Sequence, residues 1–231
     1  MALFAMSIAE NLARIESGIA TACQKSVRSR GAVKLVAVSK TKPNGMITEA
    51  VAAGQIDFGE NKVQELITKS PAFPDGIQWH LIGHLQKNKI RKALPFCDLL
   101  HTLDSLELAG QVDRIAGELG ITTKALVQVN ISEDEAKFGF GENETAEALE
   151  KITNLPNLEI VGLMTIPVFD PDPENTRIHF ANLRKLRDRL EQASGRKLPE
   201  LSMGMSHDYE VAIEEGATLV RVGSSIFGER G

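Results

Sequence analysis

Short apolar runs recur along the chain, and each is bounded by glycine, proline or polar residues. The run at residues 35–38 holds four apolar residues in succession, with no polar residue between them. A strand of this kind is covered on both faces, as the strands of a parallel sheet are. The pattern predicts strands at residues 34–40, 55–61, 78–84, 99–105, 124–132, 158–167, 200–206 and 219–228.

Between these runs, apolar residues recur at helical spacing. Steps of three and four residues place apolar side chains on one face of a helix. One such stripe precedes the first strand and predicts an N-terminal helix within residues 6–30. The stripes consist of Ile8, Leu12, Ile15 and Ile19; of Leu108, Val112, Ile115 and Leu119; of Thr145, Leu149 and Ile152; and of Leu183, Leu186 and Leu190.

The alternation of strands and helices predicts a parallel sheet. Successive strands begin about 26 residues apart on average, which leaves room for a crossover helix and two loops. An open, doubly wound sheet would have the same order. The nucleotide-binding motifs typical of open sheets, G-x-G-x-x-G and G-x-x-x-x-G-K-[ST], do not occur in the sequence. We therefore predict one α/β domain over residues 1–231, a single (β/α)8 barrel of the TIM type.

Composition and charge restrict the partners of the protein. The 231 residues are 42% hydrophobic and 25% charged, with a formal net charge of -5. Because nucleic-acid binding needs a broad basic face, this charge argues against DNA or RNA. No apolar stretch approaches the ~20 residues of a membrane span. Cys23 and Cys97 form no CxxC pair and the N-terminus lacks a signal-peptide pattern, so we expect a cytoplasmic protein with reduced thiols.

Candidate chemistry gathers at the carboxyl ends of the predicted strands, where barrels of this type carry their active sites. Lys40 ends the first strand, and partial burial there would favour its neutral, nucleophilic amine. A solvated lysine just past the strand is the alternative. Residues 204–206 and 221–225 end strands seven and eight and are rich in glycine and serine. Their N–H and hydroxyl groups suit an anion, although the same residues also make ordinary turns.

Closure of a barrel would bring Lys40 beside these two loops, because strand eight then neighbours strand one. An amine next to a phosphate site suits a ligand that carries both an aldehyde and a phosphate. Pyridoxal 5′-phosphate (PLP), held as an imine on lysine, is such a ligand. A cofactor-free aldolase that acts on a phosphorylated sugar would fit the same two features.

A series of sequence blocks, in order along nearly the whole chain, carries a resemblance. The blocks are AVSKTKP (37–43), FGEN (58–61), WHLIGHLQKNK (79–89), VNIS (129–132), GLMTIP (162–167), LSMGMSHD (201–208) and RVGSSIFGER (221–230). Together they resemble the pyridoxal phosphate homeostasis protein family, which is itself similar to the N-terminal PLP barrel of alanine racemase. The resemblance implies a cytosolic protein, monomeric or weakly dimeric, that binds PLP without established catalysis. Our hypothesis is that it buffers PLP or delivers it to PLP-dependent apoenzymes, because Lys40 would capture the aldehyde reversibly while the phosphate loops supply affinity.

The same resemblance implies roles for individual residues. These are an imine on Lys40, ring-pocket contacts from Asn61 and Met164, phosphate contacts from Ser206, Gly223 and Ser224, and a pyridine-nitrogen contact from Arg221. A guanidinium only donates hydrogen bonds and keeps its proton, so a ring nitrogen paired with it is an unprotonated acceptor. A ring in that state is a poor electron sink.

A PLP-dependent amino-acid racemase is the enzymatic alternative. Racemisation needs a second acid or base on the face opposite the lysine. In alanine racemase this group is a tyrosine from an additional β domain, whereas this sequence ends at Gly231, directly after strand eight, and we expect no such domain. The single tyrosine, Tyr209, follows Ser206 at the start of a predicted helix, where we expect a packing or surface role.

Other chemistry-bearing residues give weaker signals. His80 and His84 are four residues apart but lie on a predicted strand and turn without the glutamate of an H-E-x-x-H helix, so we expect no zinc site. His84 remains a candidate for the cavity mouth. Lys42 and Lys137 follow strands one and five and could receive PLP transiently, but we interpret both as solvated surface lysines.

Overall fold

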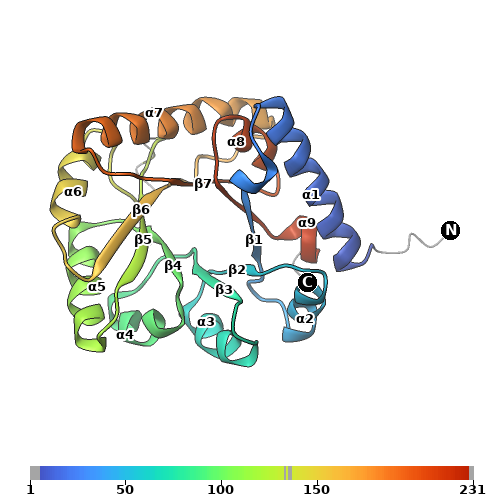
Figure 1. Ribbon diagram of the computed structural model, residues 1–231, viewed down its shortest axis with the longest axis horizontal. Helices are drawn as coiled ribbons and strands as arrows, with labels where there is room; N and C mark the ends of the chain where they lie inside the picture. Colours follow the sequence, from blue (N-terminus) through green and yellow to red (C-terminus); the bar gives the residue numbers. More distant parts are fainter. Residues whose placement is uncertain (1–5, 133, 135–136, 229–231) are drawn as a thin grey trace.

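The computed structural model describes residues 6–132, 134 and 137–228. Within this part of the chain, parallel strands pair in sequence order and close into an eight-stranded barrel, as Figure 1 shows. The predicted fold class, a (β/α)8 barrel of the TIM type, is confirmed. The assignment of all residues 1–231 to one domain stays a prediction. The strands are β1 (Lys34–Val38), β2 (Asp57–Glu60), β3 (Gln78–Leu81), β4 (Leu99–Leu103), β5 (Thr123–Gln128), β6 (Leu158–Met164), β7 (Glu200–Met205) and β8 (Leu219–Val222).

Helices surround the barrel and cover the outer face of the sheet (Figure 1). In the described part of the chain, no helix is long and apolar enough to cross a membrane. The helices are α1 (Ile8–Lys25), α2 (Asn44–Ala52), α3 (Val63–Lys69), α4 (Ile90–Ala93), α5 (Leu106–Leu119), α6 (Thr145–Ile152), α7 (Arg177–Ser194), α8 (Tyr209–Glu214) and α9 (Ser224–Phe227).

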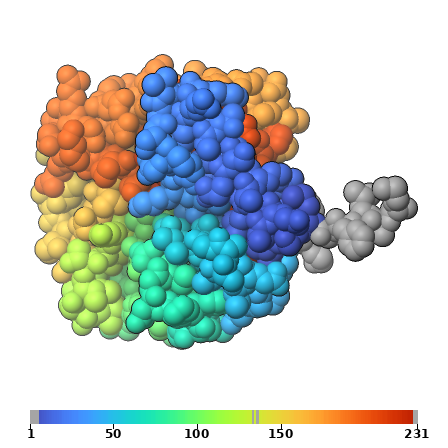
Figure 2. Space-filling view, turned by 45° about the vertical axis from the view of Figure 1, so that its right-hand side comes forward, coloured from blue at the N-terminus to red at the C-terminus, as the bar shows by residue number. Residues whose placement is uncertain are grey.

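Helix α1 shows how sequence determines a local element. Ser7 caps its first turn, because the side chains of Ser7 and Glu10 each accept a hydrogen bond from the backbone of the other. The predicted apolar stripe of this helix is buried against α2, α8 and α9. Figure 2 shows this blue N-terminal segment lying between the cyan and the orange parts of the surface. The amide of Asn11 donates to the carbonyl of Ile226 at 3.0 Å, which ties α1 to the end of the chain beside the candidate site.

The observed strands are shorter than the predicted ones, mainly at their carboxyl ends. The first strand ends at Val38 rather than at residue 40, and the last ends at Val222 rather than at residue 228. Residues 224–227, predicted as strand, form helix α9. The physical reason is that polar and glycine residues at this end of the barrel leave the sheet and form loops. In the sequence these residues directly follow an apolar run, so the predicted strands extend too far.

Two layers of apolar side chains hold the fold together. The larger layer lies between the sheet and the helices and includes Phe58, whose ring lies 5.6 Å from that of Trp79 between centroids. A smaller cluster lies inside the barrel, and its residues are Val36, Leu99, Leu126, Met164 and Leu219. The interior also contains buried polar side chains, among them His101 and Arg221. Apolar side chains therefore fill only part of the barrel interior, and hydrogen-bonded polar side chains fill the rest.

Gly162 is needed where β6 meets β7. A Cβ atom at this position would lie 1.8 Å from the carbonyl oxygen of Glu200, and a backbone atom cannot move away without breaking the sheet. We expect Gly162→Ala to destabilise the protein by about 3 kcal/mol. Gly110→Ala is the matched control. Gly110 lies on the exposed face of helix α5 with nothing within 4 Å of the added atom, and the substitution should stabilise the protein by about 0.5–1 kcal/mol.

Urea unfolding of the two variants, followed by circular dichroism, measures both changes in the free energy of unfolding. Equal effects of the two substitutions would contradict the close approach of β6 and β7 at Gly162.

Candidate functional site

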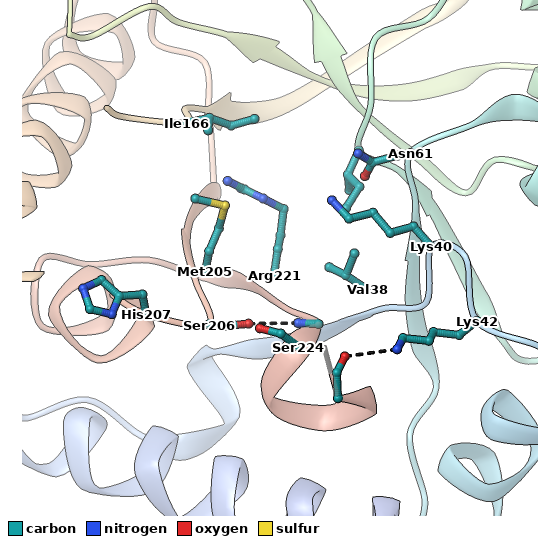
Figure 3. Close-up of a pocket in the computed structure, with 13 residues that line it drawn as sticks. Val38, Lys40, Lys42, Asn61, Ile166, Met205, Ser206, His207, Arg221 and Ser224 are labelled. Carbon is teal, nitrogen blue, oxygen red and sulfur yellow. Dashed lines mark hydrogen bonds between the residues drawn. The ribbon is translucent and has the colours of Figure 1, made fainter. Parts of the chain in front are cut away.

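A cavity of about 580 Å³ opens at the carboxyl ends of the strands, near the junction of β1 and β8 (Figure 3). Cavities of this size hold small-molecule ligands. Its lining includes Lys40, Asn61, Ser206, Arg221, Gly223 and Ser224, all of which the sequence singled out. The other lining residues are Val38, Lys42, Ile82, Ile166, Met205, His207 and Gly228.

The pairing of β1 with β8 brings these residues together. Ala37 lies opposite Val222 in the register of the two strands, so the residues that follow each strand emerge side by side. On the other side of β1, the N–H of Ser39 donates to the carbonyl of Gly59 at 3.1 Å and prolongs the pairing with β2. Figure 3 shows the side chain of Lys40 extending toward that of Arg221, which comes from the neighbouring strand β8.

The two neighbours of Lys40 in the chain are held by charged side chains. The carbonyl of Ser39 accepts a hydrogen bond from Lys69 at 2.8 Å, and the N–H of Thr41 donates to Glu65 at 2.6 Å. Thr41 has a φ of 63°, in the left-handed region, which costs about 1–2 kcal/mol for a residue with a Cβ atom. The bond to Glu65 helps to stabilise this turn, and the turn aims Lys40 at the cavity.

Lys69 is the centre of this clamp, which consists of Ser39, Glu60, Glu65 and Lys69. Its ammonium group also binds Glu60 at 2.7 Å and Glu65 at 2.8 Å. Glu60 is fully buried and accepts a further bond from the hydroxyl of Ser39 at 2.7 Å. Burial raises the pKa of Glu60 above its ordinary value of 4.5, and the hydrogen bonds from Lys69 and Ser39 offset part of that rise.

Asn61 owes its position to a glycine in the loop after the neighbouring strand, β3. A Cβ atom on Gly83 would lie 2.2 Å from the carbonyl oxygen of Asn61 and 2.8 Å from its Cα atom. Only glycine permits the loop after β3 to approach the end of β2 so closely. The FGEN block contains Asn61, but no sequence pattern indicates the need for Gly83, because the contact exists only once β2 and β3 are paired.

Arg221 lies in the interior of the barrel and reaches the cavity from β8. Its guanidinium donates to the hydroxyl of Ser202 and, at 2.9 Å, to the carbonyl of Thr165. Its exposed fraction is only 4%, and burial lowers the pKa of Arg221 to about 10. The group is therefore still a cation at neutral pH. The hydroxyl of Ser202 and the carbonyl of Thr165 hold the guanidinium in place, and Arg221 lines the cavity.

The loops after β7 and β8 form a cluster of hydrogen-bond donors. The N–H of Gly223 donates to the hydroxyl of Ser206 at 3.1 Å, which joins the two loops. A Cβ atom on Gly223 would lie 3.1 Å from the carbonyl oxygen of Val38, so a larger residue would press on the end of β1. Asp208 accepts from the N–H of Met205 at 2.7 Å and closes the turn after β7. These contacts give the loop between Met205 and Asp208 one defined conformation.

Met164 is the one residue implied by the resemblance that does not line the cavity among the described residues. It is fully buried in the apolar cluster inside the barrel. Ile166, two positions further along the chain, lines the cavity instead. Residues two apart on a strand share a face, so the alternation in GLMTIP could have identified Ile166.

Lys42 and Lys137 are less exposed than expected. Lys42 lines the cavity and donates to the carbonyl of Gly228 at 3.0 Å. Lys137 is half-buried, donates to the carbonyl of Ile166 at 2.9 Å, and has its pKa lowered by burial. The interpretation of both as solvated surface lysines stays a prediction, since each side chain is only partly exposed. Each finds a backbone carbonyl at the edge of the barrel, which a sequence pattern does not reveal.

His84 is not among the described residues that line the cavity. Its ring lies 3.0 Å from a carboxylate oxygen of Asp104 and stacks on Phe138, with 4.6 Å between ring centroids. Tyr209 is buried, as the predicted packing role requires, and its hydroxyl donates to Glu210 at 3.1 Å. Neither side chain faces Lys40 across the cavity.

Comparison with known proteins places this site in a family. The family model described as the alanine racemase N-terminal domain matches residues 11–231. The pyridoxal phosphate homeostasis protein of Aquifex aeolicus is 42% identical over 226 residues, which cover 97% of this chain and 99% of that protein. The protein of the same name from Mus musculus is 45% identical over 85% of this chain and 77% of its own length.

The chain belongs to the pyridoxal phosphate homeostasis protein family. The resemblance drawn from the sequence blocks is thus confirmed, although the last two residues of the block at 221–230 lie outside the described residues.

Solved structures agree with this family assignment. PipY of Synechococcus elongatus, solved with PLP bound, has a TM-score of 0.85 and 40% identity over 96% of this chain and 100% of that one. An alanine racemase of Clostridium difficile has a TM-score of 0.76 at 16% identity, and it matches 97% of this chain but only 57% of its own. The second likeness shows the fold alone.

Removal of Lys69 from this family member should expose the role of the clamp. Lys69→Met leaves the carboxylate of Glu60 buried without its ammonium partner, which we expect to cost about 3–5 kcal/mol at neutral pH. The pKa of Glu60 then rises further in the folded state, because Lys69 no longer lowers it. A carboxyl group whose pKa is higher in the folded than in the unfolded protein stabilises the fold at pH values below its unfolded pKa, which is about 4.5 for Glu60. This contribution to the free energy of unfolding is lost as the pH rises. The difference in the free energy of unfolding between Lys69→Met and the parent protein should therefore become smaller as the pH falls toward 4.5.

Denaturant unfolding at a series of pH values measures this difference. Lys89→Met is the matched control, because Lys89 makes only an exposed bond to Gln64. A penalty for Lys69→Met that stays constant with pH would argue against the buried pair with Glu60.

Proposed function

We propose that this chain binds PLP as an imine on Lys40 and buffers it or delivers it to PLP-dependent apoenzymes. The observation that carries the proposal is that the Lys40 amine shares one cavity with the glycine- and serine-rich loops after β7 and β8. The PLP-bound structure of PipY, 40% identical over the same fold, supports the choice of ligand. A cytoplasmic location and a monomeric or weakly dimeric state belong to the same proposal.

The residues of the cavity fit the parts of this ligand. Ser206 and Ser224 offer hydroxyl donors for a phosphate. The N–H of Gly223 donates to the Ser206 hydroxyl and would leave the proton of that hydroxyl for the phosphate. Arg221 offers a donor for an unprotonated pyridine nitrogen, and Asn61 lies on the same wall as Lys40 in Figure 3.

Lys40 would act as a reversible amine trap. Its neutral amine attacks the aldehyde carbon, a C–N bond forms, and one water molecule leaves. Addition of water reverses the step and restores both the free amine and the free aldehyde. The phosphate-binding loops then supply affinity that does not depend on the covalent bond. Reversible capture of a reactive aldehyde is the chemistry that a buffer or carrier needs.

A racemase is not favoured by the residues around Lys40. Such an enzyme needs an acid or base on the far side of the bound ring. The hydroxyl of Tyr209, the only tyrosine of the sequence, is bonded to Glu210 beside α1 and does not border the cavity. Arg221 would leave the ring nitrogen unprotonated, which weakens the electron sink that carbanion chemistry uses. Binding without turnover is therefore our proposal.

Trapping with borohydride tests the imine directly. Incubation of the purified protein with PLP should produce a yellow imine absorption band, and reduction should attach one pyridoxyl group to the peptide that contains Lys40. Lys40→Ala should lose both signals, because it removes the amine that we propose forms the imine. Lys62→Ala removes an exposed lysine at the start of α3 and should retain both signals.

Attachment at Lys42 or Lys137 instead of Lys40 would overturn the assignment of the trap. Conversion of L-alanine to D-alanine at ordinary enzyme rates of ~1 s⁻¹ or more would replace the carrier by a racemase. Cleavage of a sugar phosphate by a colourless protein would favour the aldolase.

The phosphate loops make a separate prediction about affinity. Ser224→Ala removes one hydroxyl donor to a charged group, and we expect PLP to bind about tenfold more weakly. Pyridoxal, which lacks the phosphate, should bind equally well to the variant and the parent. Ser225→Ala is the control, because Ser225 follows Ser224 in the chain but is not among the described residues that line the cavity. Spectroscopic titration measures both ligands, and an equal loss of affinity for pyridoxal would refute the phosphate role of Ser224.

A further inference from the structure

A continuous chain of hydrogen-bonded side chains crosses the interior of the barrel and ends on Arg221. From the hydroxyl of Ser202, which the guanidinium contacts, it passes to Nδ1 of His101 at 2.9 Å. Nε2 of His101 lies 2.9 Å from Nδ1 of His80, and Nε2 of His80 lies 3.1 Å from a carboxylate oxygen of Asp57. We call these five residues the relay. Asp57 is the first residue of β2, so the relay begins at the amino end of that strand.

The hydrogen bonds of the relay can all be formed in only one direction. Arg221 at one end has donors only, and the carboxylate of Asp57 at the other end has acceptors only. Ser202 accepts from Arg221 and so gives its single proton to Nδ1 of His101. His101 then carries its proton on Nε2 and donates to His80, which in turn donates from Nε2 to Asp57. Both histidines are neutral and have the same tautomer.

The reverse direction is unfavourable. It would place a proton on both nitrogens of His80, make His101 donate from Nδ1, and leave Ser202 with two donors and no acceptor for its own proton. Ser202 and His101 are fully buried, and a buried hydroxyl proton without an acceptor costs about 1–3 kcal/mol. Burial, together with the nearby cation of Arg221, lowers the pKa of His101 well below its ordinary value, which agrees with a neutral ring.

Neither the imine nor the phosphate contacts use Asp57, His80, His101 or Ser202. Their arrangement nevertheless controls Arg221, a cation that lines the cavity. Ser202 presents a lone pair to the guanidinium only when its proton points away, toward His101. The carbonyl of Thr165 holds a second nitrogen of the guanidinium at 2.9 Å, so these two acceptors determine the plane of the group.

We propose that Asp57 is a remote positioning residue for Arg221: by setting the direction of the relay, it fixes the guanidinium in the orientation that presents a donor to the ligand's ring nitrogen. This inference rests on the proposed function for its ligand. The relay itself is a property of the protein alone. Its two parts can therefore be tested separately.

The direction of the relay is tested without PLP. Nitrogen-15 NMR of the ligand-free protein distinguishes the two neutral tautomers of histidine and the doubly protonated form. We expect His80 and His101 both to be neutral with the proton on Nε2. In Asp57→Asn the end group both donates and accepts, so the acceptor-only constraint is lost and His101, two links away, should show a mixture of tautomers. Glu200→Gln, a carboxylate at the start of β7 bonded to Thr218 and Lys34, should leave both histidines unchanged.

The effect on the ligand is tested with PLP labelled with nitrogen-15 in the ring. We expect Asp57→Asn to change the chemical shift of the ring nitrogen and to weaken PLP binding severalfold, while Glu200→Gln changes neither. Ser202→Ala removes the acceptor that Arg221 uses and should have a larger effect, about tenfold on affinity. Circular dichroism and unfolding curves establish that each variant is folded.

The possible failures are distinguishable. A parent protein that binds no PLP overturns the proposed function, and the histidine spectra still decide the direction of the relay. A parent that binds PLP normally, with the same ring-nitrogen shift in Asp57→Asn and Ser202→Ala, overturns the positioning role of Asp57. A proton on Nδ1 of His101 in the parent overturns the relay.

Discussion

The pairing of β1 with β8 is the constraint on which the rest of the structure depends. Without it the sheet has two open edges, and the residues after the first and last strands have no reason to meet. With it, Ala37 lies opposite Val222, and the loops that begin at Ser39 and Gly223 share one cavity. A site composed of residues from opposite ends of a 231-residue chain is thus a direct consequence of barrel closure.

Two buried networks of polar side chains, the clamp and the relay, stabilise the site by different means. The clamp around Lys69 pairs full charges, so each member depends on its partner, and removal of one leaves an uncompensated ion. The relay instead separates the charges of Arg221 and Asp57 by neutral groups that pass hydrogen bonds from one to the next. The clamp fixes a backbone turn, whereas the relay fixes the orientation of a side chain.

Sequence patterns predicted the barrel because strand and helix periodicities are local. They also indicated Lys40 and the loops at residues 204–206 and 221–225, because the ends of parallel strands meet at one face. They did not indicate the clamp, since Glu60 and Lys69 come together only when α3 packs on β2. They considered His80 only as a zinc ligand together with His84 and expected no zinc site. They did not indicate its hydrogen bond to His101, because His101 lies on the next strand. Contacts between elements are what the pattern of one element does not contain.

The balance between binding and catalysis at this site follows from where each charge can go. A carboxylate beside a pyridine nitrogen would hold a proton there and draw electrons from the ring, whereas a guanidinium has no acceptor for such a proton. Burial lowers the pKa of Arg221 only to about 10, so the side chain stays cationic at neutral pH. A protonated ring nitrogen beside it would place two positive charges in contact. Under the proposed function, Arg221 would therefore orient the PLP ring and at the same time withhold the protonation that activates it, and this would favour retention of the ligand over its chemistry.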